Sequence, residues 1–366
     1  MKNKSLLKRL LCGVAALTML FNLCACSGKE EQEPQTQINS EPQSVSETTT
    51  EEEKQGNLNP LTGTYDLADS AVGTRPTAVV VENSPAARPQ WGLSTPDILV
   101  EGLVEGGITR MLLLYSDVSK IPKVGPIRSA RHDFVEIAEC FDSIFVHCGW
   151  STYAQSKIKA DKVNNLNGIQ GYTPKFFYRD SSRASKGTEH TGYSNGKYIA
   201  ATVSALKYRT EVKSSYANVL SFNAAESEVT PSAGACSSVK FSYSSSNNHT
   251  LTYDSGKKIY LDSLNGSARK DADSVQLSFK NILVLYCKVV SMGDSKGCID
   301  MKLENSNTGY YISDGGYETV SWTKTGSASS SKLVIKDSSG NAVKLNAGNT
   351  YIALVPTSQK SATTIN

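Results

Sequence analysis

The sequence has little net charge, no long apolar run and none of several common catalytic signatures. The formal net charge of +3 over 366 residues is too small to indicate the basic surface of a nucleic-acid-binding protein. No apolar run reaches the length of about 20 residues that a membrane-spanning helix needs. The patterns GxSxG and HExxH and a phosphate-binding glycine loop are absent as well. We therefore expect no nucleic-acid partner, no cofactor and no spanning helix, and these patterns favour no enzymatic activity.

Residues 1–26 have the pattern of an export signal. Lysines and an arginine form a basic start, and residues 10–23 form an apolar run too short to remain in a membrane as a spanning helix. The segment ends in Leu23-Cys24-Ala25-Cys26, which resembles the lipobox of bacterial lipoproteins. We expect Cys26 to be lipidated and to anchor the chain in the lipid bilayer at the extracytoplasmic face of the bacterial cell membrane. The alternative is an ordinary secretory peptide in which Cys26 occurs by chance.

Five cysteines lie beyond Cys26, and their spacing is not that of a zinc site. They are Cys140, Cys148, Cys236, Cys287 and Cys298. Cys287 and Cys298 flank a glycine-containing turn, so a disulfide across a hairpin is one interpretation. Buried free thiols are the other, because free cysteine packs like a small apolar residue. The sequence leaves the disulfide state open and predicts no metal site.

Composition divides the mature chain into a tether and two folded parts. Residues 27–58 consist largely of Glu, Gln, Ser, Thr and Pro, a composition that cannot form a core, so we expect a disordered spacer. The remaining ~300 residues exceed what one small core usually holds. We expect an N-terminal α/β domain with a mixed sheet at residues 59–220. An antiparallel β-rich domain, either a sandwich or a partly open barrel, is expected at residues 221–360.

Periodicity locates the elements within these two parts. The N-terminal part has strand patterns at residues 77–82, 98–104, 108–115 and 143–148, and helix patterns at 127–140, 153–160 and 197–208. After residue 221 the helical period disappears. Short alternating runs separated by turn residues then predict strands at 239–243, 250–253, 282–290, 298–303, 309–313, 317–323, 332–336 and 350–355. The predicted fold is therefore mixed α and β.

The segment 97–115 places carboxylates in an apolar background. Gly106-Gly107 separates two apolar runs and predicts a two-residue hairpin turn. Pairing about that turn sets Leu103 opposite Arg110. By the two-residue period of a strand, three carboxylates then share a face with Arg110: Asp97, Glu101 and Glu105. Because an unpaired buried charge is very costly, these carboxylates need partners.

The helix predicted at residues 127–140 carries basic residues in its first two turns. Gly125 suits the cap and Pro126 the first helical position. Arg128 and Arg131 then fall at the positive end of the helix dipole, where cations are unfavourable. These arginines therefore need negative groups, and the carboxylates of the hairpin are the nearest candidates across the sheet surface.

The candidate site combines these residues with the loop after the first strand and with a histidine at a strand end. Its members are Glu82, Asn83, Arg88, Asp97, Glu101, Glu105, Arg110, Arg128, Ser129, Arg131 and His147. One interpretation is an internal salt-bridge network that ties the helix to the sheet. The other is a pocket whose arginines bind a carboxylate, a phosphate or a sugar acid in bidentate fashion. The residues alone favour the network and leave the pocket open.

Three short motifs match, in order, those of penicillin-recognising serine enzymes. They are Ser156-Lys-Ile-Lys159, Ser246-Asn-Asn248 and Lys324-Thr-Gly326. The nucleophile of such enzymes opens a helix, whereas Ser156 falls in the middle of a predicted helix. We therefore interpret the match as accidental. A cell-wall polymer hydrolase or transferase stays an alternative, as does a scaffold for the cell-wall synthesis machinery that docks through its β domain.

The chain resembles the YerB-like bacterial lipoproteins, a two-part domain family of unknown function. The resemblance rests on residues 59–63 (NPLTG), 82–90 (ENSPAARPQ), 92–98 (GLSTPDI), 104–110 (VEGGITR) and 124–131 (VGPIRSAR). The C-terminal half matches more loosely, at residues 281–284, 314–322 and 348–356, and it departs from the family near Gly309, where a usual glycine is missing. The resemblance implies a cell-surface lipoprotein with an N-terminal α/β domain and a β-rich C-terminal domain. It implies no reaction and no catalytic residue.

Overall fold

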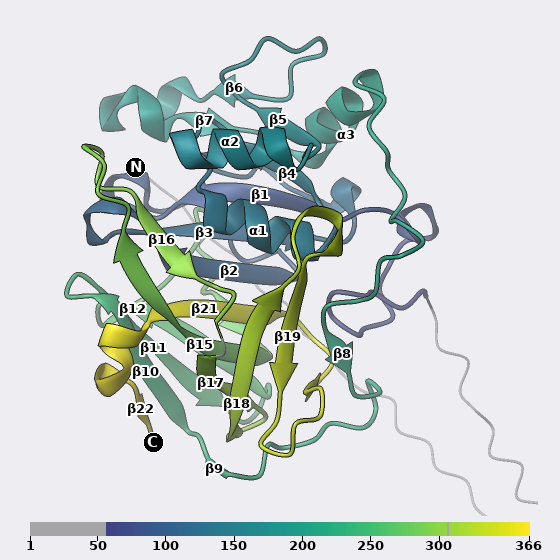
Figure 1. Ribbon diagram of the computed structural model, residues 1–366. Helices are drawn as coiled ribbons and strands as arrows, with labels where there is room; N and C mark the ends of the chain where they lie inside the picture. Colours follow the sequence, from purple (N-terminus) through teal and green to yellow (C-terminus); the bar gives the residue numbers. More distant parts are fainter. Residues whose placement is uncertain (1–55, 306) are drawn as a thin grey trace, which may run out of the picture. The chain divides into compact units, whose positions relative to one another are not determined.

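The computed structural model describes residues 56–305 and 307–366 (Figure 1). Cys26, the predicted signal peptide and nearly all of the predicted tether lie outside these residues. The described contacts begin at Asn57, which forms an antiparallel bridge with Leu67, slightly before the expected start of the folded part at residue 59. In the described residues, no helix is long and apolar enough to cross a membrane.

The helices of the described residues are short. The α-helices are α1 (His132–Cys140), α2 (Thr152–Ala160) and α3 (Gly196–Ala205). The 3-10 helices are η1 (Asp69–Ala71), η2 (Pro85–Ala87), η3 (Glu105–Gly107), η4 (Val118–Lys120), η5 (Ser181–Lys186), η6 (Thr188–His190), η7 (Ala328–Ser330) and η8 (Thr357–Ala362).

One large sheet contains eleven of the described strands. They are β1 (Thr77–Glu82), β2 (Ile98–Leu103), β3 (Thr109–Tyr115), β4 (Ile144–His147), β5 (Asn165–Asn167), β15 (Asn281–Ser291), β16 (Ile299–Lys302), β17 (Asn307–Ser313), β18 (Gly316–Thr325), β19 (Lys332–Lys336) and β21 (Thr350–Pro356). Their order across the sheet is β19-β18-β17-β15-β21-β2-β3-β1-β4-β5, and β16 pairs with β15.

Strands from both halves of the sequence share this sheet. β21 lies between β15 and β2 and runs parallel to both. β3 is antiparallel to its neighbours β1 and β2, whereas β4 is parallel to β1. The predicted mixed α and β fold with a mixed sheet is therefore confirmed. The domain limits at residues 59–220 and 221–360 stay a prediction.

A second, antiparallel sheet is built from the C-terminal half. Its strands are β10 (Ser238–Ser244), β11 (Asn247–Asp254), β12 (Ile259–Leu264), β13 (Ser267–Ala268), β14 (Ser278–Phe279) and β22 (Thr364–Ile365). The strand pattern at 239–243 is confirmed as β10, whereas β12 was not predicted. Two small pairs and one short strand complete the described strands. They are β6 (Tyr178–Arg179) with β7 (Gly192–Tyr193), β8 (Ser221–Phe222) with β20 (Lys344–Leu345), and β9 (Gly234–Ala235).

The large sheet buries both of its faces, each in a different core. On one face Val100 and Leu112 pack with Phe134 of α1. On the other face Leu99 packs with Phe241 of β10 and with further residues of the second sheet. Figure 1 shows α1 lying over strands β1 to β3. Because neighbouring residues of a strand point to opposite faces, the register of β2 and β3 decides which charged side chain enters which core.

The predicted helix at residues 127–140 begins later than expected, at His132. Residues 126–130 are extended instead, and their backbone is hydrogen-bonded on both sides. The Arg128 amide donates to Val80 at 3.1 Å, and the Arg128 carbonyl accepts from Cys148 at 2.9 Å. Pairing with strand β1 and with the segment after β4 therefore outweighs the local helix signals of Gly125 and Pro126. Neither Arg128 nor Arg131 lies inside the helix; Arg131 is its N-cap.

Candidate functional site

The turn between β2 and β3 is one residue longer than predicted. It is formed by η3 (Glu105–Gly107) and closed by the Val104 amide, which donates to the Ile108 carbonyl at 2.9 Å. Gly106 and Gly107 have φ of 69° and 74°, a left-handed conformation that favours glycine. The prediction of a two-residue turn is therefore wrong, although both glycines do serve the turn.

This longer turn shifts the register of the hairpin by one residue. Arg110 pairs with Gly102 rather than with Leu103, and Glu101 pairs with Met111. A shift of one residue moves side chains to the opposite face of the sheet. The prediction that Glu101 shares a face with Arg110 is therefore wrong, and the predicted constellation separates into two groups.

The first group, which we call the arginine cluster, lies on the α1 side of the sheet. Its members are Glu82, Glu105, Arg110, Arg128, Ser129 and Arg131. Arg131 and Glu105 form a bidentate ion pair, with Nε–Oε1 and Nη2–Oε2 distances of 2.5 and 2.8 Å. Burial opposes the ionisation of Glu105, but the hydrogen bonds and charge of Arg131 hold its pKa below the usual value. Arg131 is thus occupied by a carboxylate of the protein itself.

Arg128 is paired more loosely. Its Nε lies 3.3 Å from Oε2 of Glu82 without a hydrogen bond, and its side chain is 26% exposed. The same Oε2 of Glu82 lies 2.7 Å from Nδ1 of His190, which competes for it. Nη1 of Arg128 donates to the Glu189 carbonyl at 3.3 Å. Most of the hydrogen-bonding capacity of this guanidinium therefore remains available.

Arg110 is the least compensated residue of the arginine cluster. Its side chain is 3% exposed, and Nη1 donates to the Ser129 carbonyl at 2.6 Å. In the described residues it forms no ion pair, and its buried Nε has no hydrogen-bond partner. Burial, together with the charges of Arg131 and Arg128, lowers the pKa of Arg110 to about 9, although the charges of Glu105 and Glu82 oppose this shift. A buried guanidinium in this state is costly unless a negative group approaches it.

The second group, which we call the buried network, lies on the other face of the sheet. It consists of Glu101, His249, Asp262 and Arg269. Nη1 of Arg269 lies 2.9 Å from Oε2 of Glu101 and 3.1 Å from Oδ2 of Asp262. His249 lies 2.9 Å from Asp262 and 3.6 Å from Glu101. Burial acts against the ionisation of Glu101, but Arg269 and His249 hold its pKa well below the usual value.

Other side chains of the protein hydrogen-bond to both carboxylate oxygens of Glu101 in the buried network. Oε1 of Glu101 accepts from Asn83 at 2.8 Å and from Thr109 at 2.5 Å, and Oε2 accepts from Tyr351 at 3.0 Å. Arg88, predicted as a site residue, donates from Nη2 to the Asn83 carbonyl at 2.8 Å. The contacts of Glu101, Asn83 and Arg88 therefore fit the interpretation of an internal network.

Asn83 and Arg88 adjoin the buried network, whereas two other predicted residues lie outside both groups. Asp97 lies at the entry to β2, where Oδ2 accepts from the amide and hydroxyl of Ser116 at 2.6 and 2.8 Å. His147 is fully buried, with its ring nitrogens 2.7 Å from the Gly149 carbonyl and 3.0 Å from Asn165. Burial lowers the pKa of His147. The structure therefore keeps both outside the predicted constellation.

A hollow lined by aromatic side chains lies within residues 168–179. Its volume is about 510 Å³, and its lining includes Tyr172, Phe177 and Arg179. The guanidinium of Arg179 lies 5.2 Å from the centre of the Phe177 ring. Arg179 donates to the Thr188 carbonyl, and Arg128 donates to the carbonyl of the adjacent Glu189. Arg179, which lines the hollow, and Arg128 of the arginine cluster therefore approach the same short segment of backbone.

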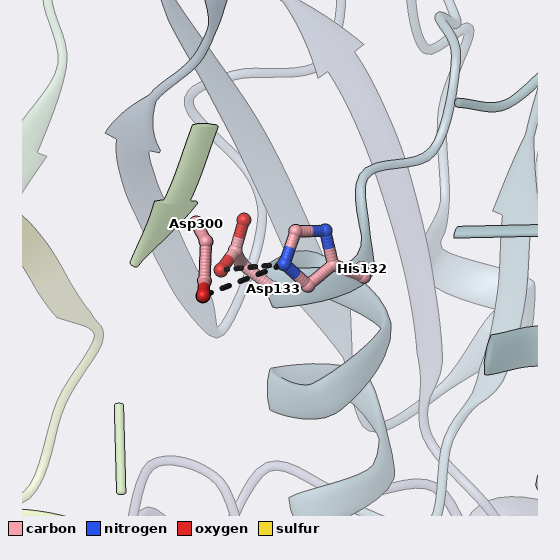
Figure 2. A group of neighbouring side chains, drawn as sticks. All are labelled: His132, Asp133 and Asp300. Carbon is pink, nitrogen blue, oxygen red and sulfur yellow. Dashed lines mark ion pairs between the residues drawn. The ribbon is translucent and has the colours of Figure 1, made fainter. Parts of the chain in front are cut away.

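One group of side chains has the composition of a metal site. His132, Asp133 and Asp300 each offer an atom within 4.8 Å of the others. Figure 2 shows the two carboxylates beside the imidazole ring. Burial raises the pKa of Asp133 to about 7. The sequence did not predict this group, because Asp300 lies on β16, far along the chain from α1. Arg269 and Asp262 also lie far from Glu101 along the chain, so the sequence did not predict that they form a network with it.

The structure also shows the state of the cysteines and the positions of the three serine-enzyme motifs. Cys140, Cys148, Cys236, Cys287 and Cys298 are free thiols, which answers the question that the sequence left open. Ser156 lies in the middle of α2, as expected, and Asn248 lies on β11 of the second sheet. Nζ of Lys324 is held 2.9 Å from Glu136.

Comparison with known proteins identifies the family. Residues 61–209 match the family described as "Protein of unknown function (DUF3048) N-terminal domain", and residues 239–352 match its C-terminal domain. The chain is 31% identical over 303 residues to "Putative lipoprotein YerB" of Bacillus subtilis, covering 81% of this chain and 86% of that protein. A crystal structure of YerB protein from Bacillus subtilis is similar, with a TM-score of 0.71, 29% identity and coverage of 84% of this chain and 99% of that one. The predicted resemblance is thus confirmed, and the chain belongs to the two-part DUF3048 family of proteins of unknown function, which includes YerB.

Proposed function

We propose that the protein is a lipoprotein, anchored through Cys26 at the extracytoplasmic face of the bacterial cell membrane, that binds an anionic envelope ligand through the arginine cluster. The export pattern of residues 1–26 and the name of the Bacillus subtilis relative support the anchor. The state of Arg110 supports the binding site, because a buried guanidinium without a paired carboxylate in the described residues attracts an anion.

The charge balance of the arginine cluster favours an added negative group. Three guanidinium groups face two carboxylates, and one of the two, Glu105, is fully engaged by Arg131. The other, Glu82, divides its contacts between Arg128 and His190. A carboxylate or phosphate of a ligand would complete the pairing of Arg128 and bring a negative charge toward Arg110. Arginine suits this role because its planar fork binds both groups in bidentate fashion.

The aromatic hollow that Arg179 lines narrows the class of ligand. Tyr172 and Phe177 offer ring faces, and Arg179 adds a positive charge beside them. Aromatic rings provide large rigid contact surfaces, and arginines orient an acidic group. A ligand that carries an acidic group on a ring, such as a sugar acid, fits both parts of this surface. An acidic segment of a membrane protein partner would fit the arginines alone.

Calorimetric titration with small probes tests this proposal. The full chain in detergent would be titrated with glucuronate, inorganic phosphate and glucose. We expect saturable binding of glucuronate, weaker binding of phosphate and none of glucose, because glucose lacks the anionic group. Equal heats for glucuronate and glucose, or no binding of any probe, would contradict a site for anionic ligands.

A further inference from the structure

The first two residues of α1 and a residue of β16 form a compact group of potential metal ligands. His132 and Asp133 open α1, and Asp300 lies on β16 (Figure 2). Nε2 of His132 lies 3.6 Å from Oδ1 of Asp133 and 3.5 Å from Oδ1 of Asp300. All three atoms lie within 4.8 Å of one another. One imidazole nitrogen thus faces two carboxylate oxygens from elements that are distant in sequence.

These distances are longer than hydrogen bonds. Nitrogen–oxygen hydrogen bonds in proteins measure about 2.7–3.2 Å, and in the described residues Nε2 of His132 makes none with Asp133 or Asp300. Tetrahedral zinc sites have metal–ligand bonds of about 2.0–2.1 Å, which separates neighbouring ligand atoms by about 3.3–3.4 Å. The observed spacing is close to the edge of such a tetrahedron.

The atoms around the two carboxylates orient them as the outer groups of a metal site do. Oδ1 of Asp133 accepts a hydrogen bond from the Met301 amide at 2.8 Å. Oδ2 of Asp300 is held by Nζ of Lys302, which leaves Oδ1 directed toward His132. Outer-shell contacts of this kind fix the rotamers of ligating carboxylates. The orientation therefore does not depend on an ion being present.

The burial of the group also suits a metal ion. The Asp133 side chain is 3% exposed, whereas His132 and Asp300 are 14% and 17% exposed. A dipositive ion would neutralise the two carboxylates, one of which is buried beside a single neighbouring imidazole. The partial exposure leaves room for water as a fourth ligand.

We infer that His132, Asp133 and Asp300 form a binding site for a divalent transition-metal ion of the zinc class, which bridges α1 and β16. An imidazole ligand and a three-residue set favour this class over Mg²⁺ and Ca²⁺, which prefer six or more oxygen ligands. The inference is independent of the proposed anion binding, because its residues and its probe are different.

Metal titration of the full chain in detergent, after treatment with a chelator, tests this inference. We expect one Zn²⁺ ion per chain, with no displacement by Mg²⁺ or Ca²⁺. His132→Ala and Asp300→Asn should each weaken binding by at least about 100-fold, because loss of an outer-shell partner alone costs 10–100-fold. Asp254→Asn, at the end of β11, is the matched control and should bind like the wild type. Both test residues are partly exposed, so the variants should keep the unfolding midpoint of the wild type.

Cobalt substitution separates this site from binding to the free cysteines. Co²⁺ bound by nitrogen and oxygen ligands gives visible bands without a thiolate charge-transfer band in the near ultraviolet. Three outcomes would overturn the inference: a thiolate band, the absence of saturable Zn²⁺ binding, or unchanged affinity in both His132→Ala and Asp300→Asn. In the last two cases the group is an ordinary ion pair.

Discussion

Glu101 and Arg110 project from opposite faces of the same β-hairpin. Arg110 pairs with Gly102, and Glu101 pairs with Met111. The two residues therefore lie in different environments. Glu101 is neutralised by Arg269 and His249 in the core between the two sheets. Arg110 faces the segment before α1 and forms no ion pair in the described residues, although Glu82 is its cross-strand neighbour. This separation distinguishes a structural charge network from a candidate binding surface.

Removing the charge of Glu101 should destabilise the fold. Glu101→Gln leaves Arg269 buried with a weaker partner, and breaking a buried pair costs about 3–5 kcal/mol. Urea denaturation should show a loss of this order in the free energy of unfolding, with no such loss in Glu304→Gln, an exposed control. If Glu101→Gln denatures like the wild type, the buried network does not stabilise the protein.

Stability should fall as the pH rises above about 6.5 because of His249. Burial opposes its protonation, but Asp262 and Glu101 hold the pKa of His249 above its usual value, with Arg269 as the neighbouring positive charge. A group whose pKa is raised on folding contributes stability that is complete below its unfolded pKa of about 6.5 and disappears as the pH rises through the folded pKa. Denaturation at several pH values should show this decline in the wild type and a smaller decline in His249→Gln. Equal declines would exclude His249 as the cause.

The Arg131–Glu105 pair should contribute modestly to stability. Both side chains are partly exposed, at 17% and 18%, so solvent screens their attraction. A double-mutant cycle of Arg131→Ala and Glu105→Gln should give a coupling free energy on the order of 1 kcal/mol. A coupling free energy near zero would show that the bidentate geometry does not stabilise the protein in solution.

The free thiols should differ in reactivity. Cys148 is partly exposed, whereas Cys140 and Cys287 are buried, and burial raises the pKa of both Cys140 and Cys287 to about 12. Because the thiolate is the reactive form, alkylation of the native protein followed by mass spectrometry should modify Cys148 first. The buried thiols should react only after denaturation. A peptide with Cys287 and Cys298 joined by a disulfide would contradict the structure.

The sequence predicted most strands and only part of the candidate site. The β-branched run of β1 (Thr77–Glu82) and the alternation of β19 (Lys332–Lys336) carry enough local information to fix both elements. The helix predicted at residues 127–140 was too long because backbone pairing with β1 holds residues 126–130 extended. Local signals do not report a contact of this kind.

For a related reason, the sequence could not predict the partners of the charged residues. Arg269 reaches Glu101 from the second sheet, and Asp300 reaches His132 from β16. Both pairs depend on how distant segments pack. The need of Glu101 for a partner was correctly inferred from the cost of buried charge. Which arginine would meet that need depended on the register of one hairpin.

The affinity of Arg128→Ala for glucuronate is the most direct test of the binding surface. Arg128 is 26% exposed, and its ion-pair partner Glu82 keeps the contact with His190, so Arg128→Ala should remain folded. Loss of a charge-assisted hydrogen bond should weaken binding by about tenfold or more. Lys240→Ala, which removes an exposed positive charge on β10, is the control and should bind like the wild type. We predict a folded Arg128→Ala protein with weakened binding; equal affinity of Arg128→Ala and the wild type would contradict the assignment of the arginine cluster as an anion-binding site.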